Sequence, residues 1–223
     1  MDDEQGDDVS RDQFAESRHR LVDQLCDRGY VERESTARAL RTVPRHEFVP
    51  EGSRRRAYAD SPLAIGNGQT ISAPHMVALM TDLLDLTPGD CVLEIGTGCG
   101  YHAAVTSAVV GAGNAYSVEY DQTLAHDAQA RLERLGYDVH VKQGDGREGW
   151  PEHAPYDCAY LTCAPRAVPE AIVEQVRLGG RIVSPEGGSR QTLVVLTPTE
   201  DGVERTTHGG VRFVSMRGDT DGS

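Results

Sequence analysis

Lysine is almost absent from this 223-residue sequence: Lys142 is the only one, and the other fixed positive charges are arginines. Acidic residues outnumber basic ones by 35 to 22, which gives a formal net charge of −13. Nucleic acid is bound through clusters of Lys and Arg, so this balance argues against nucleic acid as the main ligand. Aromatic residues are also few, at 5%. These features are typical of proteins from a high-salt cytoplasm, with compositional drift in a GC-rich genome as the alternative.

Long apolar runs are missing too, and no stretch is long enough to span a bilayer. The segment Met1–Ser10 is acidic and polar, unlike a signal or transit peptide. The five cysteines form no C-x-x-C pair and leave an odd count, which favours neither a zinc site nor a disulfide framework. We therefore expect a soluble protein of a reducing cytoplasm, without membrane contact, whose cysteines are small buried apolar residues.

The length suits one well-buried domain, which we place at residues 13–218, between an acidic tail (1–12) expected to be disordered and a short tail (219–223). Within this domain, residues 13–86 form a cap of helices and loops, and residues 87–218 form the sheet core. Helical spacing of apolar residues predicts a helix over 13–28. A second helix, capped by Ser35 or Thr36, ends before Pro44. After an ordered loop over 48–68, a third helix over 72–86 is opened by a Ser72 cap and an early proline.

From Asp90 onward, short apolar strands alternate with helices, which predicts parallel strands joined by helical crossovers. The fold class is therefore α/β, with a doubly wound, mostly parallel, Rossmann-like sheet. Two final strands without a helix between them, at 192–196 and 211–216, should form an antiparallel C-terminal edge hairpin. The other expected strands are 91–95, 115–118, 139–141, 158–161 and 181–184, and the expected helices are 101–110, 123–135 and 169–176.

A glycine-rich turn, Glu94-Ile95-Gly96-Thr97-Gly98-Cys99-Gly100, directly follows the first of these strands. Its glycines allow the backbone to turn tightly and to approach a ligand closely. The spacing is G-x-G-x-G, whereas the dinucleotide fingerprint is G-x-G-x-x-G and brings a pyrophosphate to the helix N-terminus. A sulfonium nucleoside carries no phosphate and fits the shorter spacing. Alone, however, a glycine loop is a weak signal.

Two further acidic positions follow the next two strands. Glu119, followed by Tyr120, lies about twenty residues on, where a carboxylate can accept both ribose hydroxyls of a nucleoside. Asp145 and Gly146 follow the third strand, where a carboxylate could accept from the exocyclic amine of adenine. Separately, Glu119 could be a solvated strand end and Asp145 a turn residue. Together at successive strand ends, where open α/β sheets bind ligands, they predict a site for an adenosyl ligand.

Several segments resemble the protein-L-isoaspartate O-methyltransferase family, and the resemblance runs from about Arg41 to Gly218. The string Gly68-Gln69-Thr70-Ile71-Ser72 is the most specific of them. The resemblance implies a class I methyltransferase fold and S-adenosyl-L-methionine as the cofactor. It also implies methyl transfer to the side-chain carboxylate of L-isoaspartyl residues in damaged proteins or peptides, which is a repair reaction. The other segments that carry it are 43–50, 57–58, 65–67, 73–76, 144–150, 154–157 and 211–214.

Carried over by position, the resemblance makes Ser72 the active-site serine. From the residues alone, Ser72 would more often be only a helix cap, although the two roles are compatible. His46 and His75 are expected to have packing or surface roles, because a carboxylate is already an anion at neutral pH and needs no base. The expected cofactor-binding residues, from motif and resemblance together, are Gln69, Thr70, Ile71, Glu94, Gly96, Gly98, Gly100, Glu119, Tyr120, Asp145 and Gly146.

Three positions depart from the family pattern: Ala64, the loop 162–167 and Ser215. The loop should lie beside the transferred methyl group, so its change bears on the substrate more than on the reaction. Two alternatives follow, a class I methyltransferase with another substrate such as an RNA base or small molecule, and a cofactor-binding adaptor without catalysis. We expect a monomer that needs no metal.

Overall fold

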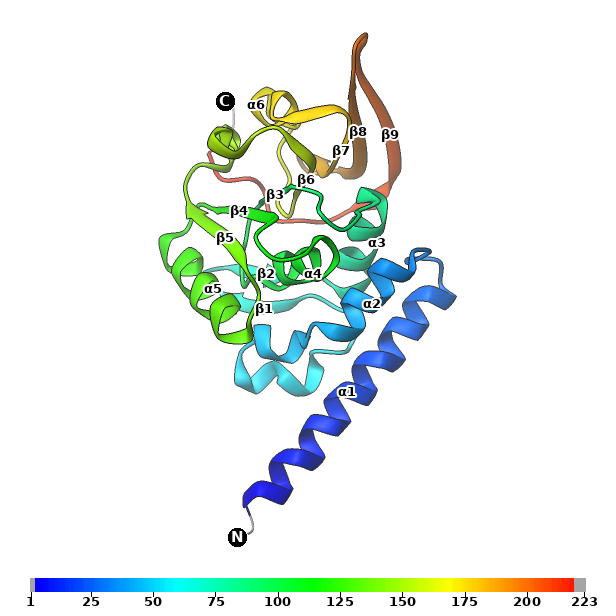
Figure 1. The fold of residues 1–223 in the computed structure, drawn as a ribbon, viewed down its shortest axis with the longest axis vertical. Coiled ribbons are helices and arrows are strands. Elements are labelled where there is room, and N and C mark those ends of the chain that lie inside the picture. Colours follow the sequence, from blue (N-terminus) through cyan, green and yellow to red (C-terminus); the bar gives the residue numbers. More distant parts are fainter. Residues whose placement is uncertain (1–2, 219–223) are drawn as a thin grey trace.

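A seven-stranded sheet in the order β5-β4-β3-β6-β7-β8-β9 forms the centre of the computed structural model, which describes residues 3–218, with side chains from Gln13 onward (Figure 1). The first five strands of this order run parallel, and β8 and β9 are antiparallel to their neighbours. The expected α/β class and the antiparallel edge hairpin are thereby confirmed. The strands are β3 (Val92–Ile95), β4 (Ala115–Glu119), β5 (Val139–Gln143), β6 (Tyr156–Leu161), β7 (Val176–Gly187), β8 (Gln191–Thr199) and β9 (Gly202–Val211).

Both faces of the parallel strands are buried, which explains their near-continuous apolar sequences. Successive side chains alternate between the faces, so that Val92 joins the core on one face and Leu93 the core on the other. Helices of the N-terminal cap, together with α4 and α5, cover the first face. The second is covered by α6 and short 3₁₀ turns. The helices are α1 (Asp3–Asp27), α2 (Glu34–Thr42), α3 (Pro74–Leu84), α4 (Tyr101–Val110), α5 (Gln122–Leu135) and α6 (Glu170–Glu174).

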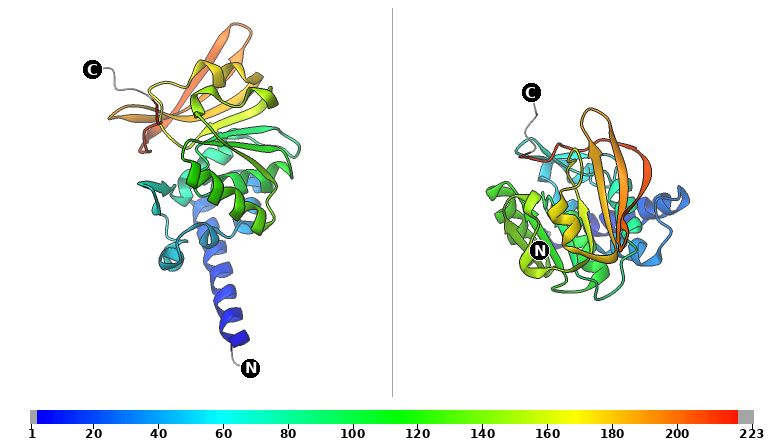
Figure 2. Two further views of the ribbon diagram at one scale, coloured as in Figure 1. Left: turned by 90° about the vertical axis from the view of Figure 1, so that its left-hand side faces the viewer. Right: turned by 90° about the horizontal axis from the view of Figure 1, so that it is seen from above.

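The N-terminal helices differ from expectation at their starts. Residues 3–12, expected to be disordered, are the first part of α1, which points away from the body of the molecule (Figures 1 and 2). They continue a helix anchored further on by Leu21 and Leu25, and therefore need no core of their own. Neither Ser35 nor Thr36 caps α2, whose N-cap is Arg33. Instead, the Asp82 carboxylate accepts hydrogen bonds from the backbone just before this helix.

The C-terminal hairpin lies earlier in the chain than the apolar pattern indicated. Its second strand is β9, whereas residues 211–216 are mostly not in a strand, so the strand expected there is wrong. Nearly all of β9 is exposed, and a strand without a buried face gives no apolar alternation to detect. The hairpin projects from the end of the molecule opposite α1 (Figure 2).

A small hairpin begins within the ordered loop expected over 48–68 and extends beyond it. Strand β1 (Leu63–Gly66) pairs antiparallel with β2 (Gln69–Ile71) through a tight turn. Asn67 and Gly68 occupy the turn with φ of 49° and 71°. This is the Asn-Gly chemistry of two-residue hairpin loops, so the signal was present in the sequence.

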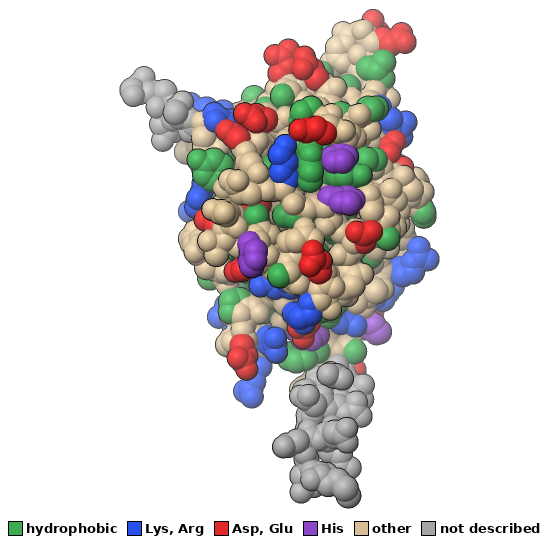
Figure 3. Space-filling view, turned by 60° about the vertical axis from the view of Figure 1, so that its left-hand side comes forward, with side chains coloured by type: hydrophobic (Ala, Val, Ile, Leu, Met, Phe, Trp, Pro, Cys, Tyr) green, Lys and Arg blue, Asp and Glu red, His purple; other side chains and the backbone are tan. Residues whose placement is uncertain are grey.

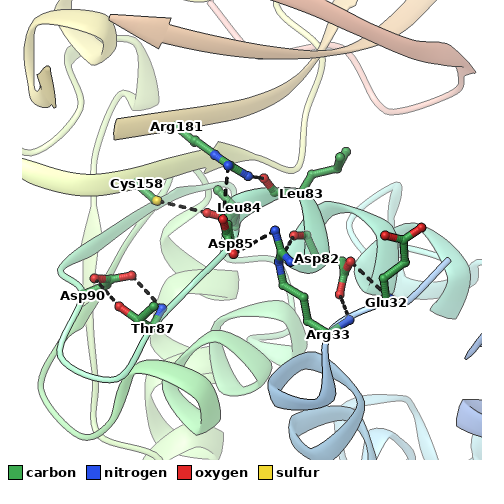
Figure 4. A network of polar contacts seen from close by, with 10 residues as sticks. All are labelled: Glu32, Arg33, Asp82, Leu83, Leu84, Asp85, Thr87, Asp90, Cys158 and Arg181. Atoms are coloured by element: carbon green, nitrogen blue, oxygen red, sulfur yellow. Dashed lines mark hydrogen bonds and ion pairs between the residues drawn. The ribbon is translucent and has the colours of Figure 1, made fainter. Parts of the chain in front are cut away.

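The C-terminal end of α3 is fixed by a network of ion pairs and hydrogen bonds (Figure 4). Asp85 pairs with Arg33 at 2.8 Å and with Arg181 at 3.1 Å. Arg33 comes from the segment before α2 and Arg181 from β7, so the network joins two distant parts of the chain to one helix end. The network therefore fixes the position of α3, which begins two residues after Ser72, relative to the sheet.

The surface shows no large area of one charge on the face drawn in Figure 3, where acidic, basic and histidine side chains lie in small separate groups. Among the described residues, none of the helices combines the length and the apolar character that crossing a membrane requires. Cys99 and Cys158 are buried, as expected, whereas Cys26, Cys91 and Cys163 are only half-buried.

Candidate functional site: a cleft at the carboxyl ends of the parallel strands

A cleft of about 860 Å³, including its open mouth, lies where the strand order reverses, at the carboxyl ends of β3, β4, β5 and β6. Open α/β sheets bind ligands at this position. We call the strand-end residues (94–99, 118–120, 146 and 162–163) the floor of the cleft. The segments 69–72 and 214–217, which close over it from outside the sheet, are its cover. Val77, Tyr101 and His102, from α3 and α4, complete the lining.

The glycine turn after β3 needs its glycines for two separate reasons. Gly96, Gly98 and Gly100 have φ of 98°, 54° and 86°, a region that favours glycine. A Cβ on Gly96 would overlap Oγ1 of Thr162, which donates a hydrogen bond to the Gly96 carbonyl at 2.5 Å. The backbone of β3 therefore lies directly against the loop after β6, and no side chain fits between them.

Gly146 forms a similar close approach, because its Cβ would overlap Cγ2 of Ile95. Asp145 and Gly100, in contrast, do not line the cleft. The Asp145 carboxylate binds the Arg147 guanidinium, which lowers the pKa of Asp145. Gly100 is the N-cap of α4 and packs on Leu132. Of the residues predicted from sequence, ten therefore meet in one cleft, namely Gln69, Thr70, Ile71, Ser72, Glu94, Gly96, Gly98, Glu119, Tyr120 and Gly146.

Glu119 is held rigidly at the end of β4. One carboxylate oxygen accepts a hydrogen bond from the Gly98 backbone N–H at 2.9 Å, and the other accepts one from the Asp121 N–H at 3.0 Å. The side chain is 8% exposed and lines the cleft. Because each carboxylate oxygen can accept more than one hydrogen bond, the group still has capacity for hydroxyl donors of a ligand.

Glu94 is the second acid of the floor, and it is buried without an opposite charge. Its Oε2 accepts a 2.5 Å hydrogen bond from Ser117 Oγ, whereas its Oε1 has no hydrogen-bond partner. Burial raises the pKa of Glu94 to about 8. A buried acceptor without a donor, beside a backbone cradle that excludes any Cβ, fits a ligand that brings hydrogen-bond donors and positive charge. A sulfonium nucleoside with an amino group is such a ligand.

Ser72 lies on the cover, and the structure removes one of its two expected roles. The helix α3 starts at Pro74 and its N-cap is Ala73, with no side-chain cap hydrogen bond. The Asp60 carboxylate instead accepts from the His75 N–H at 2.9 Å. The expectation that Ser72 caps this helix is therefore wrong, because the chain supplies an acceptor from a preceding loop. The Ser72 side chain is half-buried on the cleft wall.

The second part of the cover is the strap after β9, whose contribution the sequence only suggested. It pairs with the loop after β6, where the Ala164 N–H donates to Val214 O and the Met216 N–H donates to Ala164 O. The Gln191 side chain fixes the strap by bonding both the N–H and the carbonyl of Phe213. The Val211–Val214 motif is the feature of the sequence that marks this strap, but its apolar alternation predicts a strand there, and that prediction is wrong. The other lining residues not predicted as site residues are Val77, Ile95, Thr97, Cys99, Tyr101, His102, Val118, Thr162, Cys163, Val214, Ser215, Met216 and Arg217.

None of the histidines near the cover is placed to act as a base in the cleft. His46 stacks on Phe14 and bonds the Tyr58 hydroxyl at 2.7 Å, and His75 bonds Asp60 at 2.8 Å, so both have packing roles as expected. His102 does line the cleft, but burial lowers its pKa to about 3. It is therefore neutral at physiological pH, with Nε2 hydrogen-bonded to Thr81 at 3.0 Å.

Known proteins are similar to this chain over nearly its whole length. Residues 16–221 match the family model of protein-L-isoaspartate (D-aspartate) O-methyltransferase. Protein-L-isoaspartate O-methyltransferase 2 of Archaeoglobus fulgidus is 50% identical over 92% of this chain and 95% of its own length. The corresponding enzyme of Methanopyrus kandleri is 49% identical over 92% of this chain and 93% of its own.

Solved structures agree. A protein-L-isoaspartate O-methyltransferase with 33% identity superposes with a TM-score of 0.81 over 89% of this chain and 65% of that one. A candidate β-aspartate methyltransferase from Plasmodium falciparum, in complex with S-adenosyl-L-homocysteine, shares the fold with a TM-score of 0.77, 22% identity, and coverage of 90% and 98%. The chain therefore belongs to the protein-L-isoaspartate (D-aspartate) O-methyltransferase family, and it is an S-adenosylmethionine-dependent enzyme that methylates isoaspartyl residues of proteins.

Proposed function

We propose that the cleft performs this reaction with Ser72 holding the substrate carboxylate and the floor holding the cofactor. In an isoaspartyl residue the main chain passes through the β-carbonyl, which leaves one carboxylate free as a side group. The observation that carries the proposal is the position of Ser72. Its hydroxyl caps no helix and lies on the wall of the same cleft as the glycine turn and Glu119.

The cofactor contacts follow from the groups on the floor. Glu119 is proposed to accept the ribose hydroxyls, with Tyr120 beside it. The turn from Gly96 to Gly100 lets the backbone reach the nucleoside, and Gly146 borders the adenine end. Asp145 is proposed to accept from the adenine amine, for which its carboxylate would have to share or leave Arg147. Gln69, Thr70 and Ile71 close over the cofactor from the cover.

The protein's task in the chemical step is alignment. When bound, S-adenosylmethionine supplies a methyl group already activated as a sulfonium. The acceptor carboxylate is ionised at neutral pH, so no side chain has to remove a proton. Ser72 donates a hydrogen bond that fixes this carboxylate in line, and the two cover segments exclude water. Burial lowers the pKa of His102 on the wall to about 3, so it is too weak a base to take a proton at neutral pH, which is consistent with a site without a general base.

The Ser72→Ala variant tests this assignment. We expect methylation of an isoaspartyl peptide to fall by about tenfold or more, the scale of one hydrogen bond to a charged group, because the carboxylate loses its donor. Cofactor affinity, measured by calorimetry, should change by less than about twofold, because the Ser72 hydroxyl is proposed to contact the substrate carboxylate and not the cofactor.

The matched control is Ser189→Ala, an exposed serine away from the cleft, which should keep full turnover. A Ser72→Ala enzyme as active as this control would remove Ser72 from the mechanism. An inactive wild type that still binds the cofactor would instead favour the adaptor without catalysis. Activity on RNA or small acceptors, but not on the peptide, would favour another substrate.

We further propose that the enzyme works as a monomer in a high-salt cytoplasm and does not bind nucleic acid or membranes. The net charge of −13 supports this setting, because self-repulsion opposes the compact state until salt screens it. The melting temperature should therefore rise steeply from low to molar potassium chloride. A flat profile would assign the composition to genomic drift.

A further inference from the structure

The floor contains one acid whose environment the methyl transfer does not require. The Glu94 side chain is 2% exposed, its Oε1 has no hydrogen-bond partner, and the hydroxyls of Ser117 and Tyr160 are the groups that stabilise its charge by hydrogen bonding. A carboxylate that is buried without a counter-charge is costly, and such groups usually become neutral instead.

The groups that face Glu94 from each packed element add no positive charge. The Tyr160 hydroxyl, on β6, lowers the pKa of Glu94 through a hydrogen bond, whereas Glu119, on β4, raises it through its negative charge. Cys99 lies in the glycine turn, and burial raises the pKa of its thiol. His102 on α4 lies against Tyr160 at 4.3 Å between ring centroids and is neutral. No basic side chain among the described residues pairs with Glu94.

A chain of hydroxyls connects this buried carboxyl to the cleft. Ser117 Oγ bonds Glu94 Oε2 at 2.5 Å and Thr97 Oγ1 at 2.6 Å, and both Thr97 and Glu94 line the cleft. Hydroxyls donate and accept, and their hydrogens rotate, so this chain can run in either direction. It can therefore serve a protonated acid as well as a carboxylate, and it offers the proton a way out.

We propose that Glu94 is a neutral acid in the free enzyme and exchanges its proton for the positive charge of the cofactor on binding. The O–H bond of Glu94 breaks, the proton passes to water and buffer, and the resulting carboxylate pairs with the cationic group of the ligand. The inference rests on the cofactor lying in this cleft, as proposed above. Two cationic groups of S-adenosylmethionine qualify, the ammonium and the sulfonium, and S-adenosylhomocysteine keeps only the ammonium.

Calorimetric titration with S-adenosylmethionine tests the exchange, in buffers of equal pH but different ionisation enthalpy. The dependence of the observed enthalpy on buffer gives the number of protons released. From a pKa of about 8, Glu94 should contribute about 0.9 released proton at pH 7 and about 0.2 at pH 8.5, measured as the difference between the wild type and Glu94→Gln. Over the same range the ratio of wild-type affinity to Glu94→Gln affinity should rise about eightfold.

Glu94→Gln is the matched control, because its amide keeps an acceptor for Ser117 but has no proton to lose. The difference between wild type and variant removes the protons exchanged by the ligand's own amine and by other groups. Equal proton release in the two proteins would overturn the proposal. Absence of any binding by the wild type would instead count against the cofactor site itself.

S-adenosylhomocysteine distinguishes the two cationic groups. Release with both ligands identifies the ammonium as the partner of Glu94, and release with S-adenosylmethionine alone identifies the sulfonium. If Glu94→Gln does not fold, infrared difference spectra of the wild type decide the matter. Addition of cofactor should remove the carbonyl stretch of a protonated carboxylic acid, and a spectrum without this loss would overturn the proposal.

Discussion

The floor and the cover of the cleft are built in different ways. The floor comes from the ends of four adjacent parallel strands, and its shape is set by backbone that touches backbone or a short side chain, as where Gly96 meets Thr162. The cover comes from segments near the start and the end of the chain, 69–72 and 214–217. Short backbone pairings hold it, β2 on β1 and the strap on Ala164, together with side chains such as Gln191 on Phe213.

This difference separates the two tasks of the enzyme. A floor fixed by steric contact has little freedom to adapt, which suits a cofactor that is the same in every turnover. A cover held by short pairings outside the main sheet can adapt at smaller cost, which suits protein substrates that differ around the isoaspartyl residue. Changes to the floor should therefore act mainly on cofactor affinity, and changes to Ser72 and to segment 214–217 of the cover mainly on the KM of the peptide.

The largest effect is expected from Gly96→Ala on the floor. The new methyl group would overlap Thr162 Oγ1 at a φ of 98°, so strain and overlap add. We expect a loss of about 3 kcal/mol in the free energy of unfolding and at least about a hundredfold loss of cofactor affinity. Chemical denaturation and calorimetry measure the two quantities.

Gly136→Ala is its control, because Gly136 also has a positive φ of 78° but faces open space. It should cost only about 1 kcal/mol and leave cofactor affinity unchanged. If both variants lost the same stability and affinity, strain from the positive φ would explain the whole effect. The close approach of Gly96 to Thr162 would then contribute nothing.

The next largest effect is expected from Glu119→Ala. The variant loses the acceptors proposed for the ribose hydroxyls and also leaves the Gly98 N–H without its carboxylate. Two charge-assisted hydrogen bonds correspond to about 2–4 kcal/mol, so cofactor affinity should fall at least tenfold. The KM for the peptide, measured at saturating cofactor, should stay within about twofold. Unchanged cofactor affinity would end the ribose assignment and would remove Glu119 from the floor's function.

The same contrast explains which parts of the structure the sequence predicts. Floor residues stand in local motifs next to buried strands, so the apolar pattern that locates β3 and β4 also locates Gly96 and Glu119. The helix α4 matches its expected bounds of 101–110, because its faces are almost wholly buried. Where burial is complete, the length of the continuous apolar run carries the information.

The second part of the cover, segment 214–217, was harder to predict, because it follows an exposed strand that carries no such pattern. The strand β9 has no buried face, and the strap beyond it looks like a strand in its apolar alternation. The position of the strap is decided by Ala164 and Gln191, which are distant from it in the sequence and so give no local pattern. The prediction that Ser72 caps α3 was wrong for the same reason, since the acceptor for the His75 N–H is Asp60, in another loop.

The smallest effects should come from Asp121, which contacts the β1–β2 turn and segment 214–217 of the cover and lies next to the floor. Its Oδ1 accepts from Asn67 at 3.4 Å and caps α5 through Thr123 and Leu124, and its Oδ2 lies 3.9 Å from Arg217. Asparagine caps helices as well as aspartate, so Asp121→Asn removes only a half-exposed ion pair. We expect less than about 0.5 kcal/mol of destabilisation, and a peptide KM within about twofold, closer still in molar salt.

Asp121→Ala sharpens this test, because it removes the N-cap of α5 as well as the contacts to Asn67 and Arg217. It should lose about 1 kcal/mol of stability and raise the peptide KM about two- to threefold, while calorimetry finds cofactor affinity unchanged. The backbone N–H that Asp121 donates to Glu119 survives in both variants, so the floor keeps its geometry. A cofactor affinity that fell as far in Asp121→Ala as in Glu119→Ala would mean that cover and floor move as one body. The division between a fixed cofactor floor and an adaptable substrate cover would then be wrong.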